Sequence, residues 1–455
     1  MKSFALLLTL GSAHIHNTIA APTPPQNKER GLLDGVLGLV GGLLSDLNDV
    51  TDQASALSLL KQVKPTATPT ATSQASAALS SIYQSSPTPN NLYAAIGQVV
   101  AAGLTTNNIN DTLSAINGGL TGQNSMTNNN PRNPSPAAFP KAGNSDAPYD
   151  LTEKQLRQII YIPPTFQYGK RGAPQPVILV PGTGDTGYTT FIGNYIPLLT
   201  GSIIGDPVWL NIPGYELNDA QTNAEYVAYA INYIYGISNK RQVAVFAWSQ
   251  GNINTQWAFK YWPSTRSRVT DHVAFSPDYH GTTFANFISL GDPLPPSLLQ
   301  QQYNSKFITK LRSNNGDSAY VPTTTVYSGF FDEIVEPQQG TGASAFLKDV
   351  RKVGASNNEV QTVCAGQAAG TFYTHEGTLY NPLGFALALD ALSHSGPGQA
   401  SRLNLGSVCA PYLTPGLNLA DFKLTENSIA IAGTAILVYP NKVLQEPAIK
   451  GYATY

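Results

Sequence analysis

The sequence has few cysteines and few histidines. Its 455 residues include two cysteines and six histidines, and two of the histidines fall within the first 20 residues. Neither the cysteines nor the four later histidines show the spacing of metal ligands, so we expect no metal site. In an oxidising compartment an isolated pair of cysteines usually forms one disulfide, which here would close a loop from Cys364 to Cys409.

Charged residues are also scarce, at 12% of the chain, and the formal net charge is −2. Lys and Arg are scattered without a basic patch, which argues against nucleic acid as a partner. No apolar stretch reaches the roughly 18 residues that indicate a transmembrane anchor. A shorter apolar run at residues 4–10 follows Lys2 and precedes Ala20 and Ala21, a pattern typical of a secretory signal peptide over residues 1–21. We therefore expect a secreted, extracellular protein.

Residues 22–148 differ in composition from the rest of the chain. Leu and Val recur with a helix-like period over residues 31–63, although interspersed glycines weaken such a helix in water. We expect a pro-segment or an N-terminal extension that is mainly helical or disordered. The alternative, an interfacial membrane anchor, normally has a Lys/Arg-rich face, which is absent here. Residues 65–76 and 121–148 predict exposed linkers rich in Pro, Ser, Thr or Asn, and the sequon at Asn110 predicts glycosylation.

From residue 149 onward, apolar strands alternate with helical stretches. The predicted strands are residues 176–180, 208–210, 242–246, 272–275 and 323–327. Strands separated by helices predict an α/β domain over residues 149–455, with a mostly parallel sheet and helices on both faces. In such folds the reactive groups lie at the carboxyl ends of the strands.

Residues 247–251 read Ala-Trp-Ser-Gln-Gly and directly follow an apolar strand. A sharp turn with small flanking residues is how an α/β-hydrolase presents a nucleophilic serine, here Ser249. Ala247 stands where a Gly is usual. The alternative interpretation is that Ser249 only caps the helix that follows it.

A nucleophilic serine needs a base, and four histidines follow Ser249. The chain order in α/β-hydrolases is serine, acid, histidine, which favours His375 or His394 over His272 and His280. His375 lies inside the loop that the disulfide would close, whereas His394 lies in a polar turn.

The best acid candidate is Asp332, because it lies in a loop just after a predicted strand. Glu333 is the adjacent competitor, and Asp278 also follows a strand but lies nearer to the nucleophile in sequence. A loop aspartate alone is more often a turn-former or a helix cap.

An oxyanion hole needs the backbone N–H after the nucleophile, here that of Gln250, and a second donor from a loop after an early strand. Residues 180–187 read Val-Pro-Gly-Thr-Gly-Asp-Thr-Gly and supply that loop, with Thr183 as a hydroxyl donor. The loop lacks the sequence patterns of phosphate-binding loops.

Five segments together resemble the Candida antarctica lipase B-like family of fungal lipases, in the α/β-hydrolase superfamily. They are residues 179–184 (Leu-Val-Pro-Gly-Thr-Gly), 248–251 (Trp-Ser-Gln-Gly), 274–279 (Ala-Phe-Ser-Pro-Asp-Tyr), 321–324 (Val-Pro-Thr-Thr) and 332–335 (Asp-Glu-Ile-Val). The resemblance extends from near residue 150 to near residue 440, with the motifs in the family's order.

The resemblance implies that Ser249 is the nucleophile, Asp332 the acid and His375 the base. It implies further roles for residues around them: Thr183 and Gln250 in the oxyanion hole, Trp248 at the floor of the alcohol pocket, Asp278 and Gln300 on the acyl side, and Cys364 with Cys409 in one of the family's disulfides. The cysteines of the other two family disulfides are missing, the helix expected at 425–439 differs, and the first 150 residues have no counterpart.

We therefore expect a serine ester hydrolase, a lipase that cleaves carboxylic esters such as acylglycerols through an acyl-enzyme and needs no cofactor. We expect a monomer whose partner is a lipid or other ester at an oil–water interface. The apolar segment 281–307 is either a mobile lid or fixed structure. Two alternatives are an esterase or acyltransferase acting on small or secondary-metabolite esters, and a non-catalytic secreted protein with the same fold.

Overall fold

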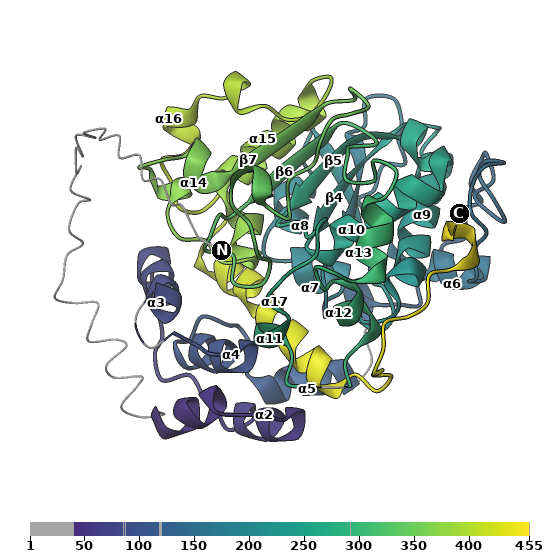
Figure 1. Ribbon diagram of the computed structural model, residues 1–455. Coiled ribbons are helices and arrows are strands. Elements are labelled where there is room, and N and C mark those ends of the chain that lie inside the picture. The colour runs from purple at the N-terminus through teal and green to yellow at the C-terminus, as the bar shows by residue number, and fades with distance from the viewer. Residues whose placement is uncertain (1–40, 85, 87, 118–120, 292, 455) are drawn as a thin grey trace, which may run out of the picture.

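Seven strands form one sheet in the order β1-β3-β2-β4-β5-β6-β7 in the computed structural model (Figure 1). The structure describes residues 41–84, 86, 88–117, 121–291 and 293–454. β1 runs antiparallel to β3, and all other neighbouring strands are parallel. The strands are β1 (Ile160–Tyr161), β2 (Gln175–Val180), β3 (Gly205–Leu210), β4 (Val243–Trp248), β5 (Val269–Phe275), β6 (Thr323–Tyr327) and β7 (Ala355–Glu359).

The five strands predicted from the sequence are β2 to β6, so the predicted parallel α/β sheet is confirmed. The two edge strands were not predicted. β1 has two residues, and β7 reads Ala-Ser-Asn-Asn-Glu, which contains no apolar alternation. β7 is a strand because its backbone pairs with that of β6, and its side chains give no indication of this pairing.

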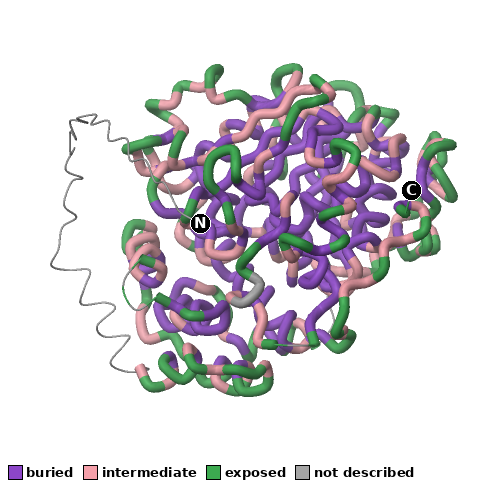
Figure 2. Tube along the Cα trace, in the orientation of Figure 1, coloured by how far each residue is buried: buried purple, intermediate pink, exposed green. Residues whose placement is uncertain are grey.

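Alternate residues of each central strand enter different apolar cores, because side chains alternate across a sheet. In β4, Val243, Val245 and Ala247 belong to one core. Ala244, Phe246 and Trp248 belong to the other. Both faces are therefore buried, as a parallel sheet requires, and the burial is visible in the central strands of Figure 2.

Helices cover both faces of the sheet. α9 (Ala220–Ile237) and α10 (Gln250–Tyr261) pack in the first core, and α8 (Tyr195–Leu199) and α15 (Pro382–Ser393) pack in the second. The shorter helices of this region are α6 (Glu153–Gln158), α7 (Gly187–Phe191), α11 (Ala285–Ile288), α12 (Pro296–Gln300), α13 (Lys306–Arg312), α14 (Val360–Val363) and α16 (Leu405–Val408). None of the helices described is long and apolar enough to cross a bilayer.

The N-terminal region is helical and packs on α17 (Leu419–Val438), which lies at the end of the sheet near α11 and α12 (Figure 1). Its helices are residues 41–48, α2 (Gln53–Leu60), α3 (Thr72–Gln84), α4 (Leu92–Ala101) and α5 (Ile109–Asn117). Over the described residues 41–63, the expected helical period corresponds to two helices. The second of them begins where the Asp52 side chain accepts a hydrogen bond from Ser55 N–H at 2.9 Å. Residues 31–40 and the predicted signal peptide lie outside the described residues.

The two segments predicted as linkers contain more structure than expected. α3 begins within the 65–76 segment. Residues 121–148 are mostly exposed, as predicted, but they are also fixed to the sheet domain: Trp209 Nε1 donates to Gln123 O at 2.8 Å, and Ala147 N donates to Tyr261 O at 2.8 Å. Composition does not reveal that backbone groups of an exposed segment find partners on the domain surface.

The predicted disulfide between Cys364 and Cys409 is confirmed. Both cysteines are buried in the second core, their Cα atoms lie 5.4 Å apart, and the bridge closes a 45-residue loop that carries His375. The cross-link restricts that loop in the unfolded chain.

We expect the double variant Cys364→Ser with Cys409→Ser to lose about 2–4 kcal/mol of unfolding free energy, because the unfolded chain regains the entropy of an open loop. Denaturant unfolding of the variant and of the wild type, each with and without a thiol reductant, measures this loss. Reductant should destabilise only the wild type. Equal unfolding midpoints for the two oxidised proteins would contradict a stabilising role for the bridge.

Candidate active site

Ser249 lies at the turn between β4 and α10. Its backbone is in the left-handed region, with φ 52° and ψ −129°. A residue other than glycine pays about 1–3 kcal/mol for such a conformation, so its neighbours must hold it. Ser249 N donates to Phe275 O at 3.0 Å, and Asn252 N donates to Ser249 O at 3.0 Å. The serine side chain makes no capping hydrogen bond, so Ser249 does not act as a side-chain cap of α10.

Glycine is required at Gly251 in this turn and at Gly182 in the loop that packs against it. A Cβ on Gly251 would lie 2.4 Å from Pro181 O and 2.8 Å from Val180 O, which are backbone atoms that cannot yield. A Cβ on Gly182 would lie 2.6 Å from Trp248 Cε3. Ala247, in contrast, is a buried strand residue whose methyl group packs in the first core. The turn therefore tolerates alanine before the serine and excludes it two residues after the serine.

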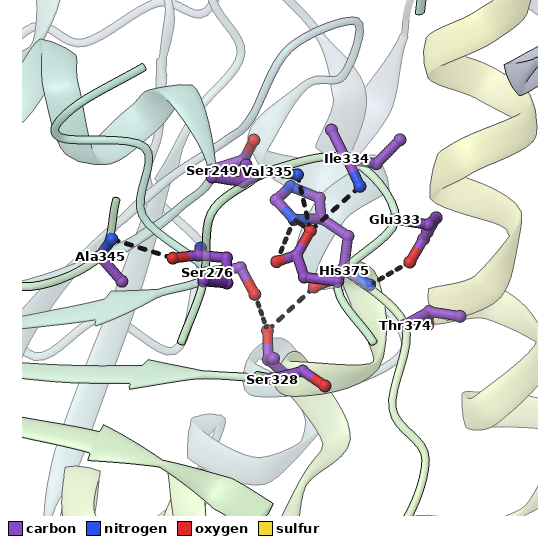
Figure 3. A network of polar contacts seen from close by, with 12 residues as sticks. Ser249, Ser276, Ser328, Glu333, Ile334, Val335, Ala345, Thr374 and His375 are labelled. Carbon is purple, nitrogen blue, oxygen red and sulfur yellow. Dashed lines mark hydrogen bonds and ion pairs between the residues drawn. The ribbon is translucent and has the colours of Figure 1, made fainter. Parts of the chain in front are cut away.

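His375 and Asp332 form a buried pair next to this turn (Figure 3). Nδ1 of His375 lies 2.9 Å from Asp332 Oδ2 and 3.0 Å from Oδ1. Oδ1 also accepts the N–H groups of Ile334 at 3.1 Å and Val335 at 2.8 Å. These bonds fix the carboxylate, and the carboxylate fixes the imidazole so that Nδ1 carries the hydrogen.

The other imidazole nitrogen of His375, Nε2, is buried and has no hydrogen-bond partner among the described residues. Burial lowers the pKa of His375, but the charge and hydrogen bond of Asp332, together with the nearby carboxyls of Glu333 and Asp278, raise that pKa more, and the net direction is upward from 6.5. An imidazole held in this way can accept a proton at Nε2 and be stabilised as a cation.

Among the other described histidines, His272 and His280 have no carboxylate partner, and His394 pairs with Asp390 at 3.1 Å but is not buried. The side chain of His394 is 53% exposed and contacts Asp390 in its own helix turn. His272 and His280 are buried, and burial lowers their pKa values to about 3 and about 4. Geometry therefore selects His375 from the two histidines that the sequence left open.

The glycine-rich loop brings Thr183 to the start of α10. Its hydroxyl lies 2.8 Å from Gln250 Oε1 and 3.0 Å from Gln301 Oε1. Gln301 Nε2 donates to Gln250 Oε1 at 2.8 Å, which ties the two glutamines together. Thr183 and Gln250 thus lie together as expected, and Gln301 joins them.

Gln300 was expected on the acyl side, but the structure places it elsewhere. Its Oε1 accepts Ala220 N–H at 2.7 Å and its Nε2 donates to Asp219 at 2.7 Å, so it is buried at the N-terminus of α9. Gln301 is the glutamine that contacts Thr183. Two adjacent glutamines at the end of the short helix α12 point in different directions, and the sequence alone gives no signal for which one enters the site.

Trp248 and Asp278 both lie close to His375. Trp248 Nε1 donates to His375 O at 3.2 Å, and the two ring centroids lie 5.1 Å apart. Both carboxyl oxygens of Asp278 are buried without a hydrogen-bond partner among the described residues. Burial raises the pKa of Asp278 to about 7, so this carboxyl can carry a proton at neutral pH and donate a hydrogen bond.

A small, mostly apolar pocket lies beside Gln301. Residues of the 281–307 segment line one side, and Ile334 and Val335 from the loop after Asp332 line the other. The segment is anchored at two points: Leu294 pairs with Val443, and Tyr93 of α4 donates to Ile288 O at 3.2 Å. The lining suits an apolar group of a substrate next to the candidate catalytic residues.

The described residues contain no group of three or more Asp, Glu, His or Cys side chains that could hold a metal ion. Asn110, the predicted glycosylation site, is exposed at the second position of α5, and its amide donates to Lys61 O at 3.2 Å.

No family model matches the sequence. Lipase B of Pseudozyma antarctica is 36% identical to this chain over 288 residues, which are 61% of this chain and 79% of that protein. The crystal structure of Aspergillus fumigatus lipase B superposes with a TM-score of 0.81 and 44% identity, and the match covers 90% of this chain and 99% of that one. The identity and the coverage show that this chain belongs to the lipase B family of α/β-hydrolases.

Proposed function

We propose that the protein is a serine ester hydrolase, a lipase that cleaves carboxylic esters such as acylglycerols through an acyl-enzyme on Ser249. The observation that carries the proposal is the His375–Asp332 pair, which leaves Nε2 free beside a serine whose backbone is held in a strained turn. The family and the apolar lining of the pocket beside Gln301 support an ester with an apolar acyl group.

In the proposed mechanism, Ser249 Oγ attacks the ester carbonyl carbon while His375 Nε2 takes the hydroxyl proton. The charge of Asp332 stabilises the imidazolium. The tetrahedral intermediate collapses as His375 returns the proton to the leaving alcohol. A water molecule, or a second alcohol, then attacks the acyl-enzyme with the same base and releases the acid or a new ester.

The negative oxygen of the intermediate receives hydrogen bonds from the backbone N–H of Gln250 and from the Thr183 hydroxyl. Thr183 has a single hydroxyl proton, which now points to Gln250 Oε1 or Gln301 Oε1. During the reaction this hydroxyl must rotate away from the neutral amide oxygen and donate to the negatively charged oxygen of the intermediate. The rotation is favourable because hydrogen bonds to ionised groups are the stronger ones. Loss of one such donor typically costs about 2.7–4 kcal/mol of transition-state stabilisation.

A fluorophosphonate probe should label the protein at Ser249, and Ser249→Ala should lose both the label and ester turnover. Asp332→Asn should lower kcat by about 10⁴-fold, because the imidazole loses its tautomer and its counter-charge. Peptide mass mapping locates the label. Ser276→Ala is a matched control, since Ser276 also follows a parallel strand at positive φ (39°). A label on another serine would contradict the assignment.

We expect kcat/KM to fall at acid pH with a midpoint above 6.5, because His375 must be neutral to act as base and its pKa is raised. A higher pKa keeps the cationic form to higher pH, so the acid limb moves upward. Rates with a short soluble ester from about pH 5 to 9 measure the limb. His394→Gln should leave it in place, whereas a flat profile for the wild type would exclude His375 as the base.

We further propose that residues 1–21 are a signal peptide, that the protein is secreted as a monomer, and that residues 22–148 are a helical extension or pro-segment of a 149–455 domain. Mass spectrometry of the secreted protein should find an N-terminus at residue 22 or later, and a mass increment on Asn110 that a glycosidase removes. An intact Met1 on secreted protein would contradict the leader.

A chain-length series separates a lipase from a small-ester esterase or acyltransferase. The lipase B relatives and the apolar lining of the pocket beside Gln301 lead us to expect higher rates on emulsified esters of longer acids than on dissolved short-chain esters. A preference for short soluble esters with no response to emulsion would contradict the lipase assignment but not the hydrolase assignment.

A further inference from the structure

Two adjacent residues hold His375 at two different points. Asp332 binds the imidazole, and Glu333 Oε2 accepts the backbone N–H of His375 at 2.9 Å (Figure 3). One strand-end loop therefore fixes both the ring and the main chain of the candidate base. The mechanism above uses Asp332 and leaves Glu333 without a role.

Glu333 is a half-buried residue whose carboxyl group lies against two other carboxyls in a cluster, with its Oε1 atom buried. Glu376 follows His375 in the chain, and Glu426 comes from α17; both are fully buried. The carboxyl of Glu376 is within hydrogen-bonding reach of those of Glu333 and Glu426. Glu426 Oε1 also accepts the hydroxyl of Tyr380 at 2.8 Å.

The cluster must hold protons. Glu333 Oε1, both carboxyl oxygens of Glu376 and Glu426 Oε2 are buried, and no donor from another described side chain or backbone group reaches them. Facing carboxylate oxygens in a dry interior repel one another unless a proton lies between them. Burial and the neighbouring carboxyls raise the pKa of Glu333 and Glu376 well above their usual range, and burial raises that of Glu426 to about 7.

A second observation points to the same cluster from the N-terminal region. Tyr83 of α3 stacks on Phe372 with ring centroids 5.9 Å apart. Its hydroxyl is buried without a partner among the described residues, close enough to Glu333, Glu376 and Glu426 for their charges to raise its pKa. The other titratable groups that face the cluster are Asp332, His375, Asp278, Tyr380 and Tyr412.

We propose that Glu333 is a positioning residue for His375 and is neutral when it acts. Its carboxyl accepts the His375 N–H, and its own O–H forms a hydrogen bond to Glu376. This chain of hydrogen bonds ends at Glu426. The inference rests on the proposed function. It separates the roles of the two adjacent acids: Asp332 acts as an anion, and Glu333 acts as a neutral acceptor and donor.

Glutamine reproduces a protonated carboxyl, because its amide offers one acceptor and a donor without charge. Glu333→Gln should therefore keep kcat within about twofold of wild type and leave the acid limb of the pH profile in place. Glu333→Leu removes the acceptor for His375 N–H. Its kcat should fall about 10- to 100-fold with KM unchanged, because a base displaced by about 1 Å loses rate without losing substrate binding.

The measurements are kcat, KM and the acid limb on a soluble ester, with unfolding temperature as the check on folding. Glu446 is the matched control, since its carboxyl accepts the N–H groups of Lys306 and Phe307 at the start of α13. Glu446→Gln and Glu446→Leu should keep wild-type kcat. If Glu333→Leu does not fold, the position of the acid limb in Glu333→Gln alone tests whether Glu333 is neutral.

Two results would overturn the inference while the wild type still turns over ester. One is a Glu333→Gln acid limb moved down by about one pH unit, which would mean that an anion had been removed. The other is a folded Glu333→Leu with wild-type kcat. A wild type that is inactive and unlabelled at Ser249 would remove the proposed function and this inference together.

Discussion

The left-handed backbone of Ser249 exists only because β4 and α10 are held from several sides. The strain of about 1–3 kcal/mol is small beside the packing that opposes its relaxation. β5 accepts the Ser249 N–H, Asn252 binds the carbonyl oxygens of Ser249 and Phe275, and Gly251 lets α10 approach the backbone of residues 180–181. The position of the serine hydroxyl relative to the rest of the site depends on this crossing of strand and helix.

The site around the serine is dry, and this makes its charges strong. In a low-dielectric interior an ion pair or a lone carboxyl interacts far more strongly than in water. The cost of burying the charge of Asp332 is offset by hydrogen bonds from two backbone N–H groups and the imidazole. Glu333, one residue later, accepts a single N–H and faces other carboxyls. The same loop thus places two chemically similar side chains in environments that favour opposite charge states.

Patterns local in sequence predicted much of this molecule. The strands β2 to β6 and the turn at Ser249 are readable because buried strands are rich in apolar, β-branched and aromatic residues, with continuous apolar runs in β2 and β4. The polar edge strand β7 is not readable, since only its pairing with β6 defines it. The choice of Gln301 over Gln300 depends on the orientation of one short helix.

The carboxyl cluster was missed for a different reason. Glu333, Glu376 and Glu426 come from two loops and a helix far apart in sequence, and each alone is an ordinary glutamate. Only the fold brings them behind His375. The packing of residues 121–148 on the domain was hidden in the same way, because polar composition is typical of both a free linker and a segment that bonds to the domain surface.

Helix α17 connects the N-terminal region to the site. A Cβ on Gly433 would lie 2.2 Å from Ile96 Cδ1 of α4, and a Cβ on Gly184 would lie 2.5 Å from Ala432 Cα. Two adjacent residues of α17 therefore touch the N-terminal helices and the loop that carries Thr183. One and a half turns earlier, Glu426 reaches the carboxyl cluster behind His375. Interiors packed at this density transmit displacements instead of absorbing them. A change in how α4 packs on α17 would thus shift both the loop that carries Thr183 and the loop that carries His375.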